Sequence, residues 1–211
     1  MMKKPLVGII DISINNILSI KRTFEHIGSE VMVINEQRNI QKFDIIVLPG
    51  VGAYHEAMKK LRDTKIILSI EQALNKNKNF LGICLGMQLL FEESEEFGVT
   101  KGIGFFSGKV ENFNKYNVEK QTFIGWNRVK FEKKKMLIQE KNLQNSAFYF
   151  VHSFFVKCKN KEIEIGTSLN GKLNFSSIVK KDNVIAFQFH PEKSGHDGLI
   201  LLKNLFKNLL Q

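Results

Sequence analysis

The chain has few cysteines and few prolines, and it contains no long apolar run. Of its 211 residues, only two are cysteine and three are proline. Two thiols far apart in the sequence are too few for a disulfide framework or a four-ligand zinc site. The apolar stretch after the basic start, residues 6–10, is closed by Asp11 and is too short for a signal peptide or a membrane span. We therefore expect a cytoplasmic protein with no metal centre and no cofactor.

Acidic residues are also scarce relative to basic ones, with 21 Asp and Glu against 31 Lys and Arg and a formal net charge of +10. Such a balance can indicate nucleic-acid or membrane binding. The lysines are scattered, however, and aromatic residues do not alternate with them. The only run of three, Lys133-Lys134-Lys135, fits a solvated face or, as an alternative, a docking surface for an acidic protein. We expect neither nucleic acid nor a membrane as a partner.

The length and the 43% hydrophobic content fit one core, so we expect a single domain over residues 1–211. Short apolar runs alternate with helical periodicity in the first half, which favours parallel strands covered on both faces. Strands are predicted at 6–10, 30–34, 44–48 and 79–83, and helices at 17–27, 56–62, 66–75 and 85–91.

The sequence pattern changes after Gly104, where strand-like runs are separated by turn residues such as Asn170-Gly171. Predicted strands cover 105–113, 122–131, 148–157, 162–169, 175–179 and 184–189, and a helix covers 198–210. The fold class is therefore α/β, with a doubly wound, mostly parallel central sheet, helices on both faces and a β-rich second half.

Cys84 lies between Gly82 and Gly86 at the point where a predicted strand changes into a helix. This layout is that of a nucleophile elbow, in which glycines leave room for a crowded backbone. A thiol there lies at a helix N-terminus, where free N–H groups favour the thiolate. The alternative is that Cys84 is a small buried apolar residue, as free cysteines often are.

His190 and Glu192 lie two residues apart, so their side chains project to the same side of an extended segment. A thiolate nucleophile needs a base, and the base needs a group that orients it. Glu192 could orient His190 while the imidazole faces Cys84. The other interpretation is an exposed pair at a strand end.

The segment Pro49-Gly50-Val51-Gly52 follows a predicted strand directly. Its glycines permit a backbone that presents N–H groups to an oxyanion, a large source of rate in acyl transfer. The same glycines equally fit an ordinary strand-to-helix turn that needs a positive φ.

Taken together, these motifs resemble the triad-type (class I) glutamine amidotransferases. The motifs are Gly82-Ile83-Cys84-Leu85-Gly86-Met87-Gln88, His190-Pro191-Glu192-Lys193-Ser194 and Pro49-Gly50-Val51-Gly52, with Gly125-Trp126-Asn127 and Tyr149-Phe150-Val151-His152-Ser153-Phe154 as further matches. The resemblance covers nearly the whole chain, in the family's order.

The resemblance implies an enzyme that hydrolyses L-glutamine to glutamate and ammonia. It implies that Cys84 is the nucleophile, His190 the base and Glu192 the orienting carboxylate, and that the backbones of Gly52 and Leu85 bind the oxyanion. The implied glutamine pocket is lined by Gly50, Gln88, Glu96, His152, Ser153 and Phe154. From the residues alone, His152 also fits a core histidine, and Glu96 a carboxylate on a solvated helix end. Cys158 belongs to no motif and is expected to be inert.

The resemblance further implies a separate (β/α)8-barrel synthase/cyclase subunit that receives the ammonia. We expect the Pro49–Gly52 segment to couple glutamine hydrolysis to that partner. Two stretches depart from the family's usual pattern, Asp11-Ile12-Ser13-Ile14-Asn15-Asn16 and Phe123-Ile124 before Gly125.

These departures keep two acceptors open. One is the imidazole glycerol phosphate precursor of histidine biosynthesis, and the other is a sugar-amidating enzyme of surface-polysaccharide synthesis. Two rivals of other classes are a catalytically inactive scaffold and a basic nucleic-acid binder.

Overall fold

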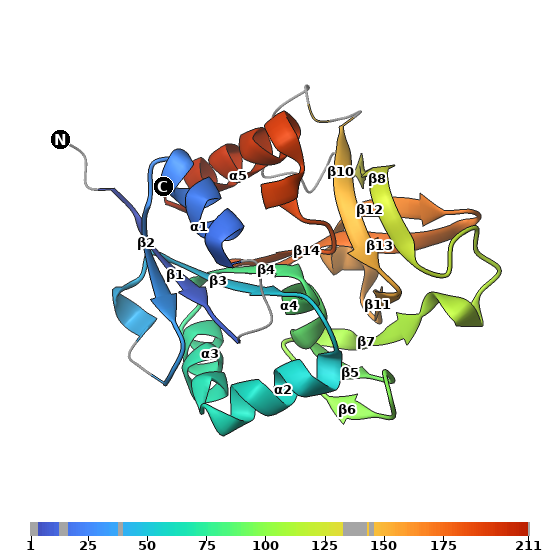
Figure 1. The fold of residues 1–211 in the computed structure, drawn as a ribbon, viewed down its shortest axis with the longest axis horizontal. Helices are drawn as coiled ribbons and strands as arrows, with labels where there is room; N and C mark the ends of the chain where they lie inside the picture. The colour runs from blue at the N-terminus through green and yellow to red at the C-terminus, as the bar shows by residue number, and fades with distance from the viewer. Residues whose placement is uncertain (1–3, 13–16, 38–39, 133–142, 144–145, 211) are drawn as a thin grey trace.

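An eight-stranded sheet crosses the molecule, with α1 and α5 on one face and α2 and α3 on the other (Figure 1). The computed structural model describes residues 4–12, 17–37, 40–132, 143 and 146–210. The strand order is β2-β1-β3-β4-β14-β13-β12-β9. Because β14 comes from the C-terminal part of the chain and lies beside β4, the sheet joins the two halves of the sequence.

The first five strands in this order pair in parallel, as the alternating strand–helix pattern predicts. They are β2 (Glu30–Ile34), β1 (Leu6–Ile10), β3 (Ile45–Gly50), β4 (Asn79–Cys84) and β14 (Val184–Phe187). Every residue of β3 and of β14 is buried, which fits strands covered on both faces. The predicted α/β class and the mostly parallel arrangement of this part of the sheet are confirmed.

The β-rich second half extends the sheet with antiparallel strands and adds two smaller sheets. The extension consists of β13 (Leu173–Lys181), β12 (Glu164–Asn170) and β9 (Lys130–Phe131). One small sheet pairs β10 (Ala147–His152) with β8 (Phe123–Arg128), and the other has the order β11 (Phe154–Cys158), β7 (Phe106–Asn112), β5 (Phe91–Ser94) and β6 (Thr100–Lys101).

The helices pack on the sheet through two separate cores, one on each face. On one face, Phe24 of α1 (Ile17–His26) stacks on Phe206 of α5 (Gly195–Leu209), with 5.3 Å between the ring centroids. On the other face lie α2 (Tyr54–Asp63), α3 (Ile66–Asn75) and the short α4 (Leu85–Leu89). Four 3-10 turns complete the described elements: Ile40–Lys42, Phe113–Lys115, Lys161–Ile163 and Pro191–Lys193.

The structure corrects the predicted end of the strand before Pro49-Gly50. Strand β3 includes both residues, which pair with Ile83 and Cys84 of β4. On the other side, pairing with β1 ends at Val47. At Pro49, β3 no longer pairs with β1, so the missing N–H of proline costs no hydrogen bond between these strands.

Three further predicted elements differ from the structure. The predicted strand 122–131 divides at Val129 into β8 and β9, which belong to different sheets. The helix after Cys84 ends at Leu89, and Phe91 already begins β5, so Glu96 does not lie on a helix end. The predicted strand 148–157 divides at Ser153 into β10 and β11, which belong to different sheets.

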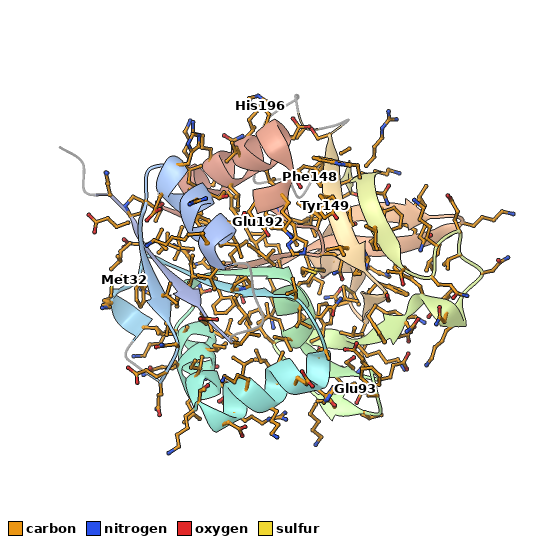
Figure 2. All side chains as sticks on the ribbon, in the orientation of Figure 1. Met32, Glu93, Phe148, Tyr149, Glu192 and His196 are labelled. Carbon is orange, nitrogen blue, oxygen red and sulfur yellow. The ribbon has the colours of Figure 1, made fainter. Side chains whose placement is uncertain are left out.

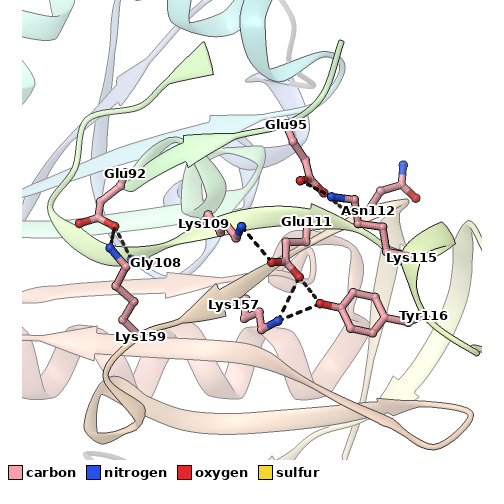
Figure 3. Close-up of polar contacts among 10 residues, drawn as sticks. All are labelled: Glu92, Glu95, Gly108, Lys109, Glu111, Asn112, Lys115, Tyr116, Lys157 and Lys159. Atoms are coloured by element: carbon pink, nitrogen blue, oxygen red, sulfur yellow. Dashed lines mark hydrogen bonds and ion pairs between the residues drawn. The ribbon is translucent and has the colours of Figure 1, made fainter. Parts of the chain in front are cut away.

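Ion pairs cover the small sheet that contains β5, β7 and β11 (Figure 3). The buried carboxylate of Glu111 lies 3.5 Å from Lys109 Nζ and 3.4 Å from Lys157 Nζ, and it accepts a hydrogen bond from the Tyr116 hydroxyl. Burial alone would raise the pKa of Glu111, but Tyr116 and Lys157 hold it below its ordinary value. On β5, Glu92 pairs with Lys159 at 2.7 Å. These contacts fix the strand that leads to Glu96.

Some sequence predictions fall outside the described residues. They concern Lys133-Lys134-Lys135 and residues 13–16 of the N-terminal stretch that departs from the family's usual pattern. Within the described part of the chain, no helix is long and apolar enough to cross a membrane.

Candidate active site

Cys84 is the last residue of β4 and the residue before α4, the strand–turn–helix order that its motif predicts. Its backbone has φ 54° and ψ −109°, a conformation that is strained for any residue except glycine. The flanking glycines are steric requirements, because a Cβ on Gly86 would lie 1.7 Å from the carbonyl oxygen of Leu48. A Cβ on Gly82 would lie 3.0 Å from the Cβ of Ala186. Close packing of α4 on β3 therefore holds the sulfur at this turn.

His190 is fixed by backbone contacts to β10. Its N–H donates to the carbonyl oxygen of Tyr149 at 2.9 Å. The hydroxyl of Ser194 donates to the His190 carbonyl at 2.6 Å and accepts from the Tyr149 N–H at 3.0 Å. Figure 2 labels Tyr149 and Glu192, which lie below α5 in this view. The segment 190–194 is thus held rigidly between β10 and α5.

Glu192 orients the imidazole of His190. Its Oε1 lies 2.8 Å from His190 Nδ1, and the two side chains are only 2% and 3% exposed. The alternative interpretation, an exposed pair at a strand end, is therefore wrong. Because Nδ1 faces a carboxylate, it carries a proton, and Nε2 is left to face Cys84.

The charges around His190 stabilise its protonated form. Burial lowers its pKa, but the neighbouring Cys84 and then Glu192 outweigh burial and raise the pKa to about 10. His190 Nε2 is buried and forms no hydrogen bond with the described residues, but Cys84 lies near enough to His190 to raise its pKa. His190 is therefore held in its protonated form beside Cys84 at neutral pH.

A cavity of about 470 Å³ opens beside the sulfur. The walls contain Cys84 and seven of the other predicted site residues: Gly52, Leu85, Gln88, Glu96, His152, Ser153 and Phe154. The structure brings these residues together from β4, α4, the loop before α2, the turn after β5 and the junction of β10 with β11. His190 and Glu192 lie behind the cavity, next to a smaller one that they share with Gly50.

Gly50 does not line the larger cavity. It pairs with Cys84 across β3 and β4 and lies against Leu85, whose Cβ would be 2.9 Å from a Cβ on Gly50. Its place in the structure is that of a close-packing residue under α4.

Glu96 holds the loop that carries Gly52. Its Oε2 accepts a hydrogen bond of 2.6 Å from the backbone N–H of Tyr54, the first residue of α2. A carboxylate at a helix N-terminus satisfies a free N–H and complements the helix dipole. Gly52 itself has φ 93°, which a residue with a side chain rarely adopts.

His152 is neutral and surrounded by aromatic rings. Its Nδ1 lies 2.8 Å from the carbonyl oxygen of Phe154 and so must donate to it, which leaves Nε2 as an acceptor. The rings of Phe113, Phe150 and Phe175 lie 5.2, 5.6 and 5.4 Å away. Burial lowers the pKa of His152 to about 4. The hydrogen bond to Phe154 acts in the opposite direction, and the nearby His190 lowers the pKa further.

The sequence interpretation missed some residues of this site. Val51, Val151 and Lys193 also line the cavity, and Gln188 contacts Cys84 from behind it. Each lies inside a motif or next to one, but none carries a residue type or spacing that singles it out. Cys158 lies elsewhere, buried beside Ser176, and burial raises the pKa of its thiol to about 12. In the described part of the chain, no three His, Cys, Asp or Glu side chains cluster as metal ligands would.

Comparisons with known proteins agree with this geometry. The family model for class-I glutamine amidotransferases matches residues 8–209. The imidazole glycerol phosphate synthase subunit HisH of Caldanaerobacter subterraneus subsp. tengcongensis is 38% identical over 200 residues, which cover 94% of this chain and 96% of that protein. Subunit HisH 1 of Campylobacter jejuni subsp. jejuni serotype O:23/36 is 41% identical over 200 residues, covering 94% and 98%.

Solved structures show the same fold at low sequence identity. The structure described as PurLQS from Thermotoga maritima has a TM-score of 0.78 at 17% identity and covers 97% of this chain and 99% of that one. A crystal structure of a glutamine amidotransferase has a TM-score of 0.72 at 16% identity, covering 96% and 98%. The chain therefore belongs to the class-I glutamine amidotransferase family.

Proposed function

We propose that this chain is the glutaminase subunit of an imidazole glycerol phosphate synthase in histidine biosynthesis. It hydrolyses L-glutamine to glutamate and ammonia and passes the ammonia to a (β/α)8-barrel synthase/cyclase subunit. The observation that carries the chemistry is the position of Cys84 in the cavity wall, with His190 and Glu192 behind it. The relatives named above are subunits of that synthase, which supports the pathway.

In the first step, the Cys84 thiolate attacks the carboxamide carbon of glutamine and forms a tetrahedral intermediate. The imidazolium of His190 then gives its Nε2 proton to the leaving nitrogen, so that ammonia departs and a glutamyl thioester remains. Water, deprotonated by the now neutral His190, attacks the thioester and releases glutamate. Glu192 keeps the Nδ1 proton in place and stabilises the charged imidazole throughout.

We assign oxyanion stabilisation to the backbone N–H groups of Leu85 and Gly52. Leu85 is the first residue of α4, so its N–H has no carbonyl of the same helix to bond. Gly52 lines the same cavity, in the loop that Glu96 holds. Gln88, His152, Ser153 and Phe154 then line the rest of the glutamine pocket.

The ammonia must be kept from bulk water, where at neutral pH it is mostly ammonium and no longer nucleophilic. A separate subunit that accepts it directly avoids this loss, and a complex formed in the cytoplasm is expected. We propose that the Pro49–Gly52 segment senses the partner, because it ends a central strand beside Cys84 and leads into the loop with Gly52.

The decisive test of the chemistry is Cys84→Ala in the complex with the barrel subunit. Glutamate release from glutamine should fall by at least about a thousand-fold, because the nucleophile acts as one unit with its base. Product formation from ammonium salts should persist in the same complex. Cys158→Ala is the matched control and should keep glutamine hydrolysis within about two-fold of the unmodified protein, since that thiol lies outside the cavity.

Retained glutamine hydrolysis in Cys84→Ala would overturn the proposal. An unmodified complex that uses ammonium salts but never glutamine would indicate an inactive scaffold. If instead the chain activated only a sugar-amidating enzyme, the glutaminase chemistry would stand and the acceptor would be wrong.

A further inference from the structure

Gln188 is a fully buried amide in direct contact with the proposed nucleophile. It lies between the end of β14 and His190, and none of its side chain is exposed. Glutamine is mostly found at protein surfaces, and a buried amide without partners is costly. The partners of Gln188 therefore indicate why it is there.

The orientation of the Gln188 amide follows from a chain of hydrogen bonds. The carbonyl oxygen of Phe154 can only accept, so the group of Gln88 that lies 2.9 Å from it must be the –NH2. The same –NH2 lies 3.1 Å from the Gln188 side chain, which must therefore present its oxygen, Oε1. The –NH2 of Gln188 consequently points to the other side, where Cys84 Sγ lies 3.9 Å away.

Among the described residues, a donor and an acceptor lie at the same distance from the sulfur, besides His190. The carbonyl oxygen of Val151 also lies 3.9 Å from Sγ and can accept a proton only from the thiol. Gln188 Nε2 can only donate, so it favours the thiolate. With Cys84 only 5% exposed, water contributes little to solvating that charge, and a fixed N–H donor replaces it.

We propose that Gln188 is a further catalytic residue of the glutaminase reaction, a neutral amide that donates to the Cys84 thiolate and to the sulfur as it becomes the leaving group of the thioester. Gln88 and the Phe154 carbonyl act as positioning groups, because they set which end of the Gln188 amide faces the sulfur. Since Gln88 and Phe154 also line the cavity, the same hydrogen-bond chain connects the proposed glutamine pocket to the nucleophile. This inference rests on the proposed function for its role in turnover, but not for its effect on the thiolate.

The experiment compares Gln188→Leu and Gln188→Met with the unmodified protein. We measure the rate of Cys84 alkylation by iodoacetamide as a function of pH, and kcat and KM for glutamine in the complex. Hydrogen bonds to charged groups are worth enough to change a rate about 10- to 100-fold, so kcat should fall by that factor with KM changed less than about three-fold. The half-maximal pH of Cys84 alkylation should rise by about one unit.

Two further variants separate this role of Gln188 from a role in packing. Gln188→Glu places a carboxylate at the sulfur and should shift the alkylation profile further than Gln188→Met does. Gln72→Leu on the exposed side of α3 is the matched control and should leave both readouts unchanged. Thermal unfolding of each variant shows whether it is folded, and Gln188→Met, the longer unbranched replacement, serves if Gln188→Leu does not fold.

A folded variant with an unchanged alkylation profile would overturn the role of Gln188, because a group that only fills space does not bias the thiolate. If the unmodified complex does not hydrolyse glutamine, the proposed function fails, while the alkylation profile still tests the contact between Gln188 and Cys84.

Discussion

His152 and His190 are two buried histidines whose surroundings move their pKa values in opposite directions. For His152, burial lowers the pKa to about 4, so the imidazole stays neutral at physiological pH. For His190, burial is outweighed by Cys84 and Glu192, and the pKa rises to about 10. His152 is therefore neutral and His190 protonated at neutral pH, although a sequence pattern cannot distinguish them.

These shifts predict how stability depends on pH. In the unfolded chain, His152 binds a proton below its ordinary pKa of 6.5, but in the folded protein it does so only below about pH 4. The folded state therefore loses stability as the pH falls from 6.5 to 4. The contribution of His152 to the free energy of unfolding should fall by about 2 kcal/mol between pH 7 and pH 5. The contribution of His190 has the opposite sign, because it is present below pH 6.5 and lost as the pH rises toward 10.

Urea unfolding at pH 7 and pH 5 checks the acid side. His152→Gln removes the titrating group, so the free energy of unfolding of this variant should change less between the two pH values than that of the unmodified protein. His196→Gln is the control, since His196 is exposed near the start of α5 (Figure 2). An equal pH dependence in all three proteins would contradict the buried neutral state of His152.

At the scale of elements, the packing of α4 on β3 decides where Cys84 lies. Gly86→Ala should destabilise the protein by about 1–3 kcal/mol and reduce glutamine hydrolysis strongly, because the new Cβ would lie 1.7 Å from a backbone oxygen. Gly98→Ala is the control, with open space around the new Cβ but φ +100°, and it should cost about 1 kcal/mol. Thermal unfolding and glutamate release measure both effects. If the two variants behaved alike, close packing at Gly86 would not matter.

Most elements of the first half could be predicted because their residues carry a local period. The strands at 6–10 and 30–34 and the helix at 66–75 have the predicted bounds. Errors arose where a tertiary contact overrides the local signal. Strand β3 continues through Pro49-Gly50 because β4 pairs with it, and α4 stops at Leu89 because Phe91 joins the small sheet. The two-residue strands β6 and β9 are too short to carry any period.

At the scale of the whole molecule, the single-domain organisation over residues 1–211 stays a prediction. The eight-stranded sheet supports it, because β14 pairs with β4 on one side and with β13 on the other. We expect one cooperative unfolding transition. In urea, the fluorescence of Trp126, the only tryptophan, reports on the second half, and the reactivity of the Cys84 thiol reports on the first. Coincident midpoints are expected, whereas two separated midpoints would indicate two domains.

The sequence by itself determined the elbow around Cys84, the His-x-Glu pair and the alternation of strands with helices, because each depends on neighbours along the chain. Only the tertiary structure decided that Cys84 meets His190 and Gln188, that Glu96 caps α2, and that Gly50 lies under Leu85 and outside the cavity. The physical reason is that these contacts depend on the order of strands in the sheet, and above all on β14 lying beside β4. That order is set by long-range pairing and packing, which leave no local period in the sequence.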